Sequence, residues 1–96
     1  MGQVRPAARK GDSTTANVAN IGVIGGHLIG GSPDVFINKQ PAARVQDAGQ
    51  YCIAVINQVT EGAQTVFING KPAAKKTSSM SLSGQVTSGS PDVLLG

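Results

Sequence analysis

The 96-residue sequence contains one tetrapeptide three times, and this repeat constrains the fold more than any other feature. The three copies are Pro6-Ala7-Ala8-Arg9, Pro41-Ala42-Ala43-Arg44 and Pro72-Ala73-Ala74-Lys75. A second element interleaves with them, because the segments 31–38, 62–69 and 89–96 each place a glycine four residues before a valine. Units of this kind bury their apolar face only by packing against one another. We therefore interpret the chain as three copies of one supersecondary unit.

The spacing of the two elements predicts how the units are connected. From the glycine of the second element to the next tetrapeptide the spacing is constant, at ten residues from Gly31 to Pro41 and from Gly62 to Pro72. From tetrapeptide to glycine it shortens along the chain and is 25, 21 and 17 residues. We infer a fixed unit joined by hairpins of adjustable length. Because a solenoid would need distinct polar caps, the repeat phase predicts closure, with the last strand lying beside the first.

Local residue chemistry predicts an all-β fold built from short hairpins. The second elements contain β-branched and aromatic runs bounded by turn-forming residues, which is typical of strands. Asn69-Gly70 is a strong signal for a type I′ hairpin turn, and Asn38-Lys39 occupies the same place one unit earlier. The stretches 20–29 and 52–59 lack the 3.6-residue apolar period of a helix. We expect no helix longer than a turn or two.

Length and composition fit one small domain spanning residues 1–96. Its units are expected at about 6–40, 41–71 and 72–96, after a short segment 1–5. Only 3% of the residues are aromatic while 13 are glycine, so the core is small and the fold should depend on backbone pairing or on a partner surface. A single cysteine excludes a disulfide-stapled scaffold, and no apolar run reaches the ~18–20 residues of a membrane-spanning helix.

Charge and motif content exclude several classes of function. We expect no enzyme activity, because the one histidine lies in no Ser-His-Asp pattern and the glycines follow no phosphate-binding pattern. The basic residues fall in three windows around the tetrapeptides, which predicts three basic patches on the surface. These patches could dock on an acidic partner, contact anionic lipid or form a solvated rim, whereas the lack of aromatic stacking platforms argues against nucleic acid. The basic residues are Arg5, Arg9, Lys10, Lys39, Arg44, Lys71, Lys75 and Lys76.

The repeats resemble those of the PAAR-repeat proteins, a family named after the Pro-Ala-Ala-Arg tetrapeptide. The resemblance covers essentially the whole chain, because two PAAR copies, one PAAK copy and three second elements keep a single register. It implies a small cone of β-hairpins with internal pseudo-threefold symmetry. Such cones cap and sharpen the end of a homotrimeric β-helical spike in type VI secretion systems and contractile phage tails, and so help to pierce the target envelope.

The resemblance also implies partners and a place of action. One chain would cap one spike trimer, each unit meeting an equivalent subunit end. The protein would assemble in the bacterial cytoplasm within a tail or secretion apparatus, be delivered outward on contraction and contact the target membrane transiently. An effector-recruiting adaptor and a glycan-binding β module are the alternatives. The repeated apolar set could dock on the spike or form the core of the cone, and it comprises Val35, Phe36, Ile37, Val66, Phe67, Ile68, Val93, Leu94 and Leu95.

Members of this family typically hold zinc near the apex through three histidines and one cysteine, and this chain departs from that pattern. Its only candidates of these types are His27 and Cys52, whereas a structural zinc site needs four ligands. We expect no cofactor, although a metal completed by carboxylates such as Asp12 or Asp47, or by water, is an alternative. Without metal, Cys52 would be a small buried residue and His27 would share a polar layer with Gln58 and Gln85. Apolar packing would then hold the apex, through Ile21, Val23, Ile24, Val55, Ile56 and Leu82.

Overall fold

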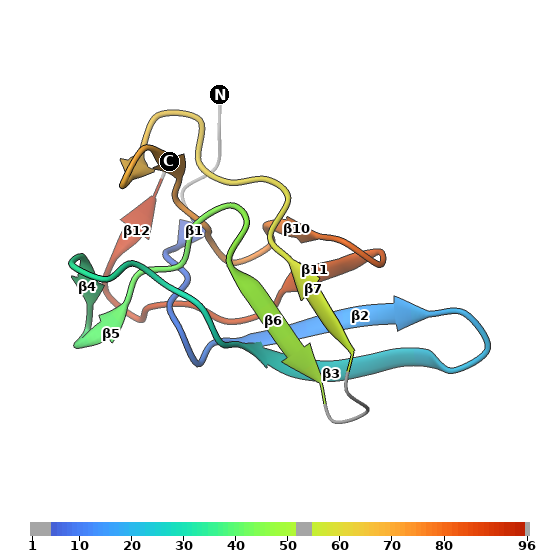
Figure 1. Ribbon diagram of the computed structural model, residues 1–96. Helices are drawn as coiled ribbons and strands as arrows, with labels where there is room; N and C mark the ends of the chain where they lie inside the picture. The colour runs from blue at the N-terminus through green and yellow to red at the C-terminus, as the bar shows by residue number, and fades with distance from the viewer. Residues whose placement is uncertain (1–4, 52–54, 96) are drawn as a thin grey trace.

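A computed structural model of the protein describes residues 5–51 and 55–95, and all regular structure in these two segments is β-strand (Figure 1). The prediction of an all-β fold is confirmed. Within the described residues, no helix is long and apolar enough to cross a membrane. The strands are β1 (Arg5–Pro6), β2 (Ser13–Val18), β3 (Gly22–Leu28), β4 (Phe36–Ile37), β5 (Gln40–Pro41), β6 (Ala48–Tyr51), β7 (Ile56–Gln58), β8 (Phe67–Ile68), β9 (Lys71–Pro72), β10 (Ser79–Met80), β11 (Gly84–Val86) and β12 (Leu94–Leu95).

Three antiparallel hairpins share one sheet, in the strand order β10-β11-β2-β3-β6-β7. The two outer strands of this sheet approach each other, because Val59 and Met80 form a β-bridge and Ser81 N–H donates to the carbonyl of Gln58 at 2.9 Å. The hairpins therefore form a nearly closed ring. Their first strands shorten along the chain, from six residues in β2 to four in β6 and two in β10. The variable spacing in the sequence thus corresponds to hairpins of decreasing length, as predicted.

Three shorter two-stranded ribbons, β4–β5, β8–β9 and β1–β12, lie on the side away from the turn of the long β2–β3 hairpin (Figure 1). Phe36 pairs with Pro41 and Phe67 pairs with Pro72, and in the third ribbon Leu94 pairs with Pro6 in the same register. The last strand therefore lies beside the first, which confirms the predicted closure.

The turns of the two complete ribbons have the geometry that their sequences predict. Both central residues of each turn have positive φ, at 52° and 68° for Asn38-Lys39 and 53° and 78° for Asn69-Gly70. Positive φ at both positions defines the type I′ turn, whose twist matches that of the flanking strands. The lysine at the second position of the first turn accepts a conformation that the glycine of the second turn adopts at no steric cost.

The three tetrapeptides meet in a ring of backbone hydrogen bonds, which we call the PAAR ring. Ala8 N–H donates to the Ala74 carbonyl, Ala43 N–H to the Ala8 carbonyl and Ala74 N–H to the Ala43 carbonyl, at 2.9–3.0 Å. A second cycle runs from the residue after each tetrapeptide to the proline carbonyl of the next, through Lys10, Val45 and Lys76. Each segment is therefore bonded to the next and the third returns to the first. No segment can leave without breaking bonds to both of the others.

The two alanines of each tetrapeptide face two different cores. Successive side chains of an extended segment point in opposite directions, so the first alanines pack among the ribbons and the second alanines among the hairpins. All six are completely buried. Beside the first alanines lie Ala63, Ile68 and Leu95, and beside the second alanines lie Leu28, Val59, Met80 and Val86. The PAAR ring is thus an alanine layer between two small apolar clusters, and only a methyl group fits where three backbones converge.

The glycine that begins each second element lies against the backbone of a tetrapeptide. A Cβ atom on Gly62 would stand 2.5 Å from the carbonyl oxygen of Ala73. Ala63 N–H donates to this same carbonyl at 2.8 Å. A side chain at residue 62 would therefore push the second element away from the ring and break this bond. The glycine repeat in the sequence reflects close backbone contact as well as turning.

The far end of the hairpins differs from the sequence-based expectation. Ile21, Val23, Ile56 and Leu82 were expected to pack together there, but their side chains are 58%, 72%, 59% and 45% exposed, so that prediction is wrong. The interior is instead filled by Tyr51, which is 3% exposed and donates its hydroxyl to the Thr15 carbonyl at 2.9 Å. One large aromatic ring occupies the narrow space between the strands, so the aliphatic side chains point outward.

Candidate functional site

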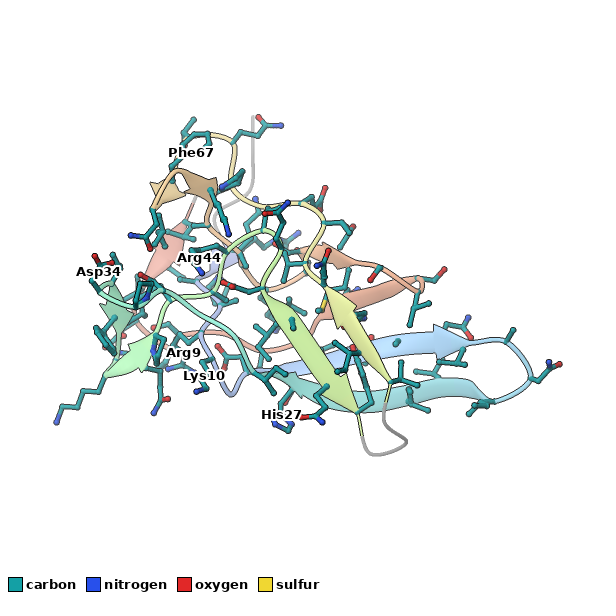
Figure 2. All side chains as sticks on the ribbon, in the orientation of Figure 1. Arg9, Lys10, His27, Asp34, Arg44 and Phe67 are labelled. Atoms are coloured by element: carbon teal, nitrogen blue, oxygen red, sulfur yellow. The ribbon has the colours of Figure 1, made fainter. Side chains whose placement is uncertain are left out.

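Strand alternation divides the repeated apolar set into inward and outward side chains. The inward residues Ile37, Ile68 and Leu95 pack against the first alanines of the tetrapeptides, as do Val66 and Val93. The preceding residue of each ribbon points out to solvent, and its exposed fraction is 57% for Phe36, 59% for Phe67 and 57% for Leu94. Figure 2 shows Phe67 at the outer edge of its ribbon. Val35 is 38% exposed. We call Phe36, Phe67 and Leu94 the apolar triad. It presents one large apolar side chain per ribbon.

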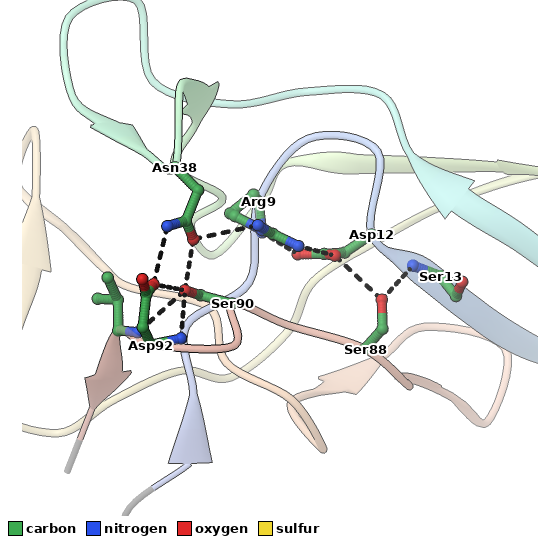
Figure 3. A network of polar contacts seen from close by, with 8 residues as sticks. Arg9, Asp12, Ser13, Asn38, Ser88, Ser90 and Asp92 are labelled. Carbon is green, nitrogen blue, oxygen red and sulfur yellow. Dashed lines mark hydrogen bonds and ion pairs between the residues drawn. The ribbon is translucent and has the colours of Figure 1, made fainter.

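A polar network ties the first ribbon to the third unit (Figure 3). Arg9 forms an ion pair with Asp12, with Nη2 2.9 Å from Oδ1, and its Nη1 donates to Asn38 Oδ1 at 3.1 Å. Asn38 Nδ2 donates to Asp92 Oδ1 at 2.8 Å, and Ser90 Oγ donates to Asn38 Oδ1. Ser88 Oγ donates to Asp12 Oδ1 at 3.0 Å. Residues from distant parts of the chain thus brace neighbouring ribbons.

The same network occurs one unit later with the same residue types. Arg44 pairs with Asp47 at 3.0 Å and donates to Asn69 Oδ1 at 3.1 Å. Asn69 Nδ2 donates to Asp34 Oδ1 at 2.9 Å, and Ser32 Oγ donates to Asn69 Oδ1 at 2.6 Å. Two of the three contacts between neighbouring ribbons are therefore braced by an arginine, an asparagine, a serine and an aspartate.

The third contact, between the β8–β9 ribbon and the β1–β12 ribbon, has different residue types at all of these positions. Lys75 replaces the arginine, Ser78 replaces its aspartate partner, and Ala63 and Thr65 replace the serine and aspartate. The asparagine position corresponds to Gly96, which lies outside the described residues. Ser78 still accepts the amide N–H of Lys75 at 3.0 Å, as Asp12 and Asp47 accept those of Arg9 and Arg44. The turn itself is kept while the charged bracing is lost.

The networks shift the pKa values of their members. The pKa of Asp92 lies below its ordinary value, chiefly because Asn38 donates to its carboxylate and secondly because Ser90 does. Asn69 and Ser32 lower the pKa of Asp34 in the same way. A folded-state pKa below the unfolded value gives stability that is present above the ordinary pKa and is lost as pH falls through the lowered value. Because both carboxylates are exposed, screening keeps this acid effect small.

Replacing Asn38 by glycine is expected to raise the pKa of Asp92 toward its ordinary value. Glycine keeps the positive φ of 52° but removes the amide that donates to the carboxylate. The measurement is an NMR titration of the aspartate carboxyl groups. Asp34, whose amide partner is Asn69, is the internal control and should titrate as before. An unchanged pKa of Asp92, or an equal rise for both groups, would contradict the assignment of the network.

The candidate metal ligands are not brought together in the described part of the chain. His27 is exposed on the outer face of β3, opposite Ser13 and Gln50 (Figure 2). Gln58 on β7 and Gln85 on β11 are also exposed, so these three side chains form no shared layer inside the hairpins. Cys52 lies outside the described residues. Among residues 5–51 and 55–95, no three His, Cys, Asp or Glu side chains are grouped so that they could hold a metal. This donor set does not fit the zinc site that the family resemblance implies.

The basic windows divide into paired and unpaired side chains. Arg9 and Arg44 are largely neutralised by Asp12 and Asp47, whereas Lys10, Lys39 and Lys76 are exposed. Lys10 lines an open cleft of about 380 Å³ with Arg9, Asp12 and Asn38. Arg9 and Arg44 are therefore bracing residues, and Lys10, Lys39 and Lys76 carry exposed positive charge.

Sequence reasoning assigned Asn38 and Asn69 to hairpin turns and missed that their side chains bond to Asp92 and Asp34 of other units. A signal was nevertheless present. The first and second units, which keep the arginine, each have an asparagine in their own ribbon. The neighbouring unit that each of them contacts, the third and the first respectively, has a Ser-Pro-Asp segment. The unit with Lys75 follows Gly62-Ala63-Gln64-Thr65 instead. The arginine and the Ser-Pro-Asp segment are thus replaced together at the third contact between ribbons, which indicates that these residue types interact.

Known proteins match this chain in sequence. The family model for the PAAR motif matches residues 20–82. The chain is 38% identical over 69 residues to double-stranded DNA deaminase toxin A of Burkholderia cenocepacia, an alignment covering 70% of this chain and 5% of that protein. It is 35% identical over 81 residues to two proteins of Pseudomonas aeruginosa, NAD(P)(+) glycohydrolase toxin Tse6 and (p)ppApp synthetase toxin Tas1. These alignments cover 74% of this chain and 19% and 18% of the relatives.

The chain spans less than a fifth of the length of each of these relatives. The activities in their names are therefore properties of much longer proteins. With three tetrapeptides closed into one ring and a family match over most of its length, the chain belongs to the PAAR-motif family.

Proposed function

We propose that this protein is a structural spike tip, which caps and sharpens the end of a trimeric β-helical spike in a contractile injection machine. Type VI secretion and phage tails are the two machines that this proposal covers. One chain would sit on one spike trimer, with its PAAR ring centred on the threefold axis of the spike. The protein would assemble with the machine in the bacterial cytoplasm and leave the cell on contraction.

The observation that supports the proposal best is the cyclic hydrogen bonding of the PAAR ring together with the apolar triad. A homotrimer presents three identical subunit ends, so one monomer can satisfy all three only if it carries three similar patches around an axis. The ribbons supply such patches, each with one exposed apolar side chain beside the tetrapeptide. The end of a β-helix exposes strand edges and interior side chains that need cover. We assign the ribbon side of the molecule to this docking.

The named relatives support delivery as the shared role of this segment. All three are called toxins, and their three named activities differ. A common segment beside different activities fits a carrier or tip role better than catalysis. We propose that this chain contributes no enzyme activity of its own. Recruitment of an effector by the same surface is the second function in view, and the toxin names are the observation that favours it.

Replacing Phe67 by aspartate is expected to weaken spike binding by at least about tenfold, since burial of an aromatic anchor commonly dominates an interface. Phe67 is 59% exposed in the free protein, so the substitution should leave the fold intact. The measurement is co-purification and titration with the trimeric β-helical spike of the same cell or phage. Gln85→Glu, which adds the same charge at an exposed position on β11, is the matched control. Equal binding by the Phe67→Asp protein and the wild type would count against docking through the ribbons.

Absence of zinc stays a prediction, and elemental analysis tests it. A protein purified without chelator should contain far less than one zinc per chain, because the family ligands are reduced to one histidine and one cysteine. A stoichiometric amount that disappears in a His27→Ala variant would show that the metal is kept with substitute ligands.

A further inference from the structure

The charged residues of this protein lie outside its three hairpins. None of the eight basic and five acidic residues lies in the segments 13–33, 48–60 or 77–91. These segments contain all the strands of the three hairpins, and His27 is the one histidine in them. In Figure 2, Arg9, Lys10, Asp34 and Arg44 lie toward the ribbons, while the long β2–β3 hairpin extends away from them. The far end of the molecule is therefore free of formal charge.

This uncharged end also exposes its aliphatic side chains. Val23 is 72% exposed on β3, and its partner across the hairpin is Asn17. The N–H of Asn17 in turn donates to the carbonyl of Leu82 at 2.9 Å, so the turn of the third hairpin lies beside β2. Ile21 in the first turn and Ile56 on β7 are more than half exposed. Aliphatic side chains from all three hairpins thus point outward at the same end.

We infer that the hairpin end is a lipid-contacting surface, which enters the interfacial region of a neutral phospholipid bilayer. Moving an ionised side chain from water into lipid is unfavourable, so a surface that meets lipid should lack charges. Exposed valine, isoleucine and leucine gain free energy when they leave water. The nearly closed sheet satisfies most backbone groups within the hairpins, which lipid contact also requires.

A lipid surface explains the side chains here better than a protein partner does. Interfaces between proteins are enriched in aromatic residues and arginine. The exposed side chains of the described hairpin strands include neither, since Tyr51 is buried inside. Their polar members are serine, asparagine, glutamine and one histidine. The ribbon side, which carries both phenylalanines and the exposed Lys39, has the composition of a docking surface instead.

This inference deepens the proposed function, because a chain docked through its ribbons would present the hairpin end first to a target envelope. The inference adds which side chains would meet the envelope and which kind of lipid they would contact. The surface would reduce the cost of entering the bilayer by burying aliphatic side chains, with no need for anionic lipid.

The test is binding of the purified chain to phosphatidylcholine vesicles, measured by flotation at millimolar lipid. We expect measurable binding that is insensitive to salt, because burial of apolar side chains is not screened as ion pairing is. Val23→Asp should reduce the partition coefficient at least about tenfold, since it removes a valine that lipid would bury and adds a charge. Thr65→Asp, which adds the same charge at an exposed position on the ribbon side, should bind within about twofold of wild type.

Four outcomes overturn the inference: no wild-type binding, binding that salt abolishes, equal binding by the Val23→Asp protein, or equal loss in the Thr65→Asp protein. Sedimentation of the free chain adds a fifth, because a dimer that Val23→Asp disrupts would assign the surface to a second copy. Spike binding is measured on the same samples. Spike binding without vesicle binding would refute this inference alone, and vesicle binding without spike binding would refute the proposed docking.

Discussion

Replacing Ala43 by leucine is expected to lower the free energy of unfolding by about 3 kcal/mol, at the upper end for overpacked cores. Ala43 is completely buried, and its N–H and C=O both take part in the PAAR ring. Three backbones converge there, so a longer side chain cannot be accommodated by moving one segment alone. The measurement is chemical denaturation followed by circular dichroism.

The control for this prediction is the same substitution at an exposed alanine. Ala19 lies in the turn of the β2–β3 hairpin and is exposed, so Ala19→Leu should change stability by less than about 0.5 kcal/mol. Ala8→Leu and Ala74→Leu should resemble Ala43→Leu, since the three residues hold equivalent places in the ring. If leucine were tolerated at any one of them, the alanine layer would not be the centre of the fold.

Replacing Gly26 by alanine is expected to cost about 3 kcal/mol, again by overpacking. A Cβ atom at this residue would stand 2.3 Å from the carbonyl oxygen of Gln50 and 2.4 Å from the ring of Tyr51. Backbone on one side and the buried ring on the other prevent relaxation. The pairing of β3 with β6 would open at this point. Loss of thermal stability, with hydrogen exchange increased in these two strands, is the expected result.

The neighbouring glycine provides the matched control. A Cβ atom on Gly25 would have no atom within 4 Å, and the backbone there needs no positive φ. Gly25→Ala should therefore leave stability unchanged or raise it by about 0.5 kcal/mol, through lower entropy of the unfolded chain. If the two substitutions cost the same, the close approach of Tyr51 and Gln50 to β3 would be wrong.

Much of the fold could be predicted from the sequence because the repeats carry the information locally. The turn at Asn69-Gly70 needs positive φ at two residues, and few residue types supply it. The shortening hairpins followed from spacing alone, and the pairing of β1 with β12 followed from the repeat phase. These features depend on neighbours in sequence or on the count of residues between motifs.

Other features depend on which side of a strand each residue occupies. The sequence marked Val35, Phe36 and Ile37 as one apolar run, but only the fold separates exposed Phe36 from Ile37, which packs against the ribbon core. A run of two strand residues is too short for alternation to show. The outward orientation of Val23 and Ile56 was missed because Tyr51 fills the interior of the hairpins from a distant strand. Long-range packing of this kind leaves no local pattern.

The central claim is that one chain with three similar patches caps one threefold spike, and the mass of the complex tests it most directly. Native mass spectrometry of the chain with its purified trimeric spike should give a single species with one chain per three spike subunits, even with the chain in excess. Binding should fall in the Phe67→Asp protein and not in the Gln85→Glu protein. A complex with three chains per spike trimer would contradict the account. Each spike subunit would then bind its own copy, and no PAAR ring could be centred on the threefold axis of the spike.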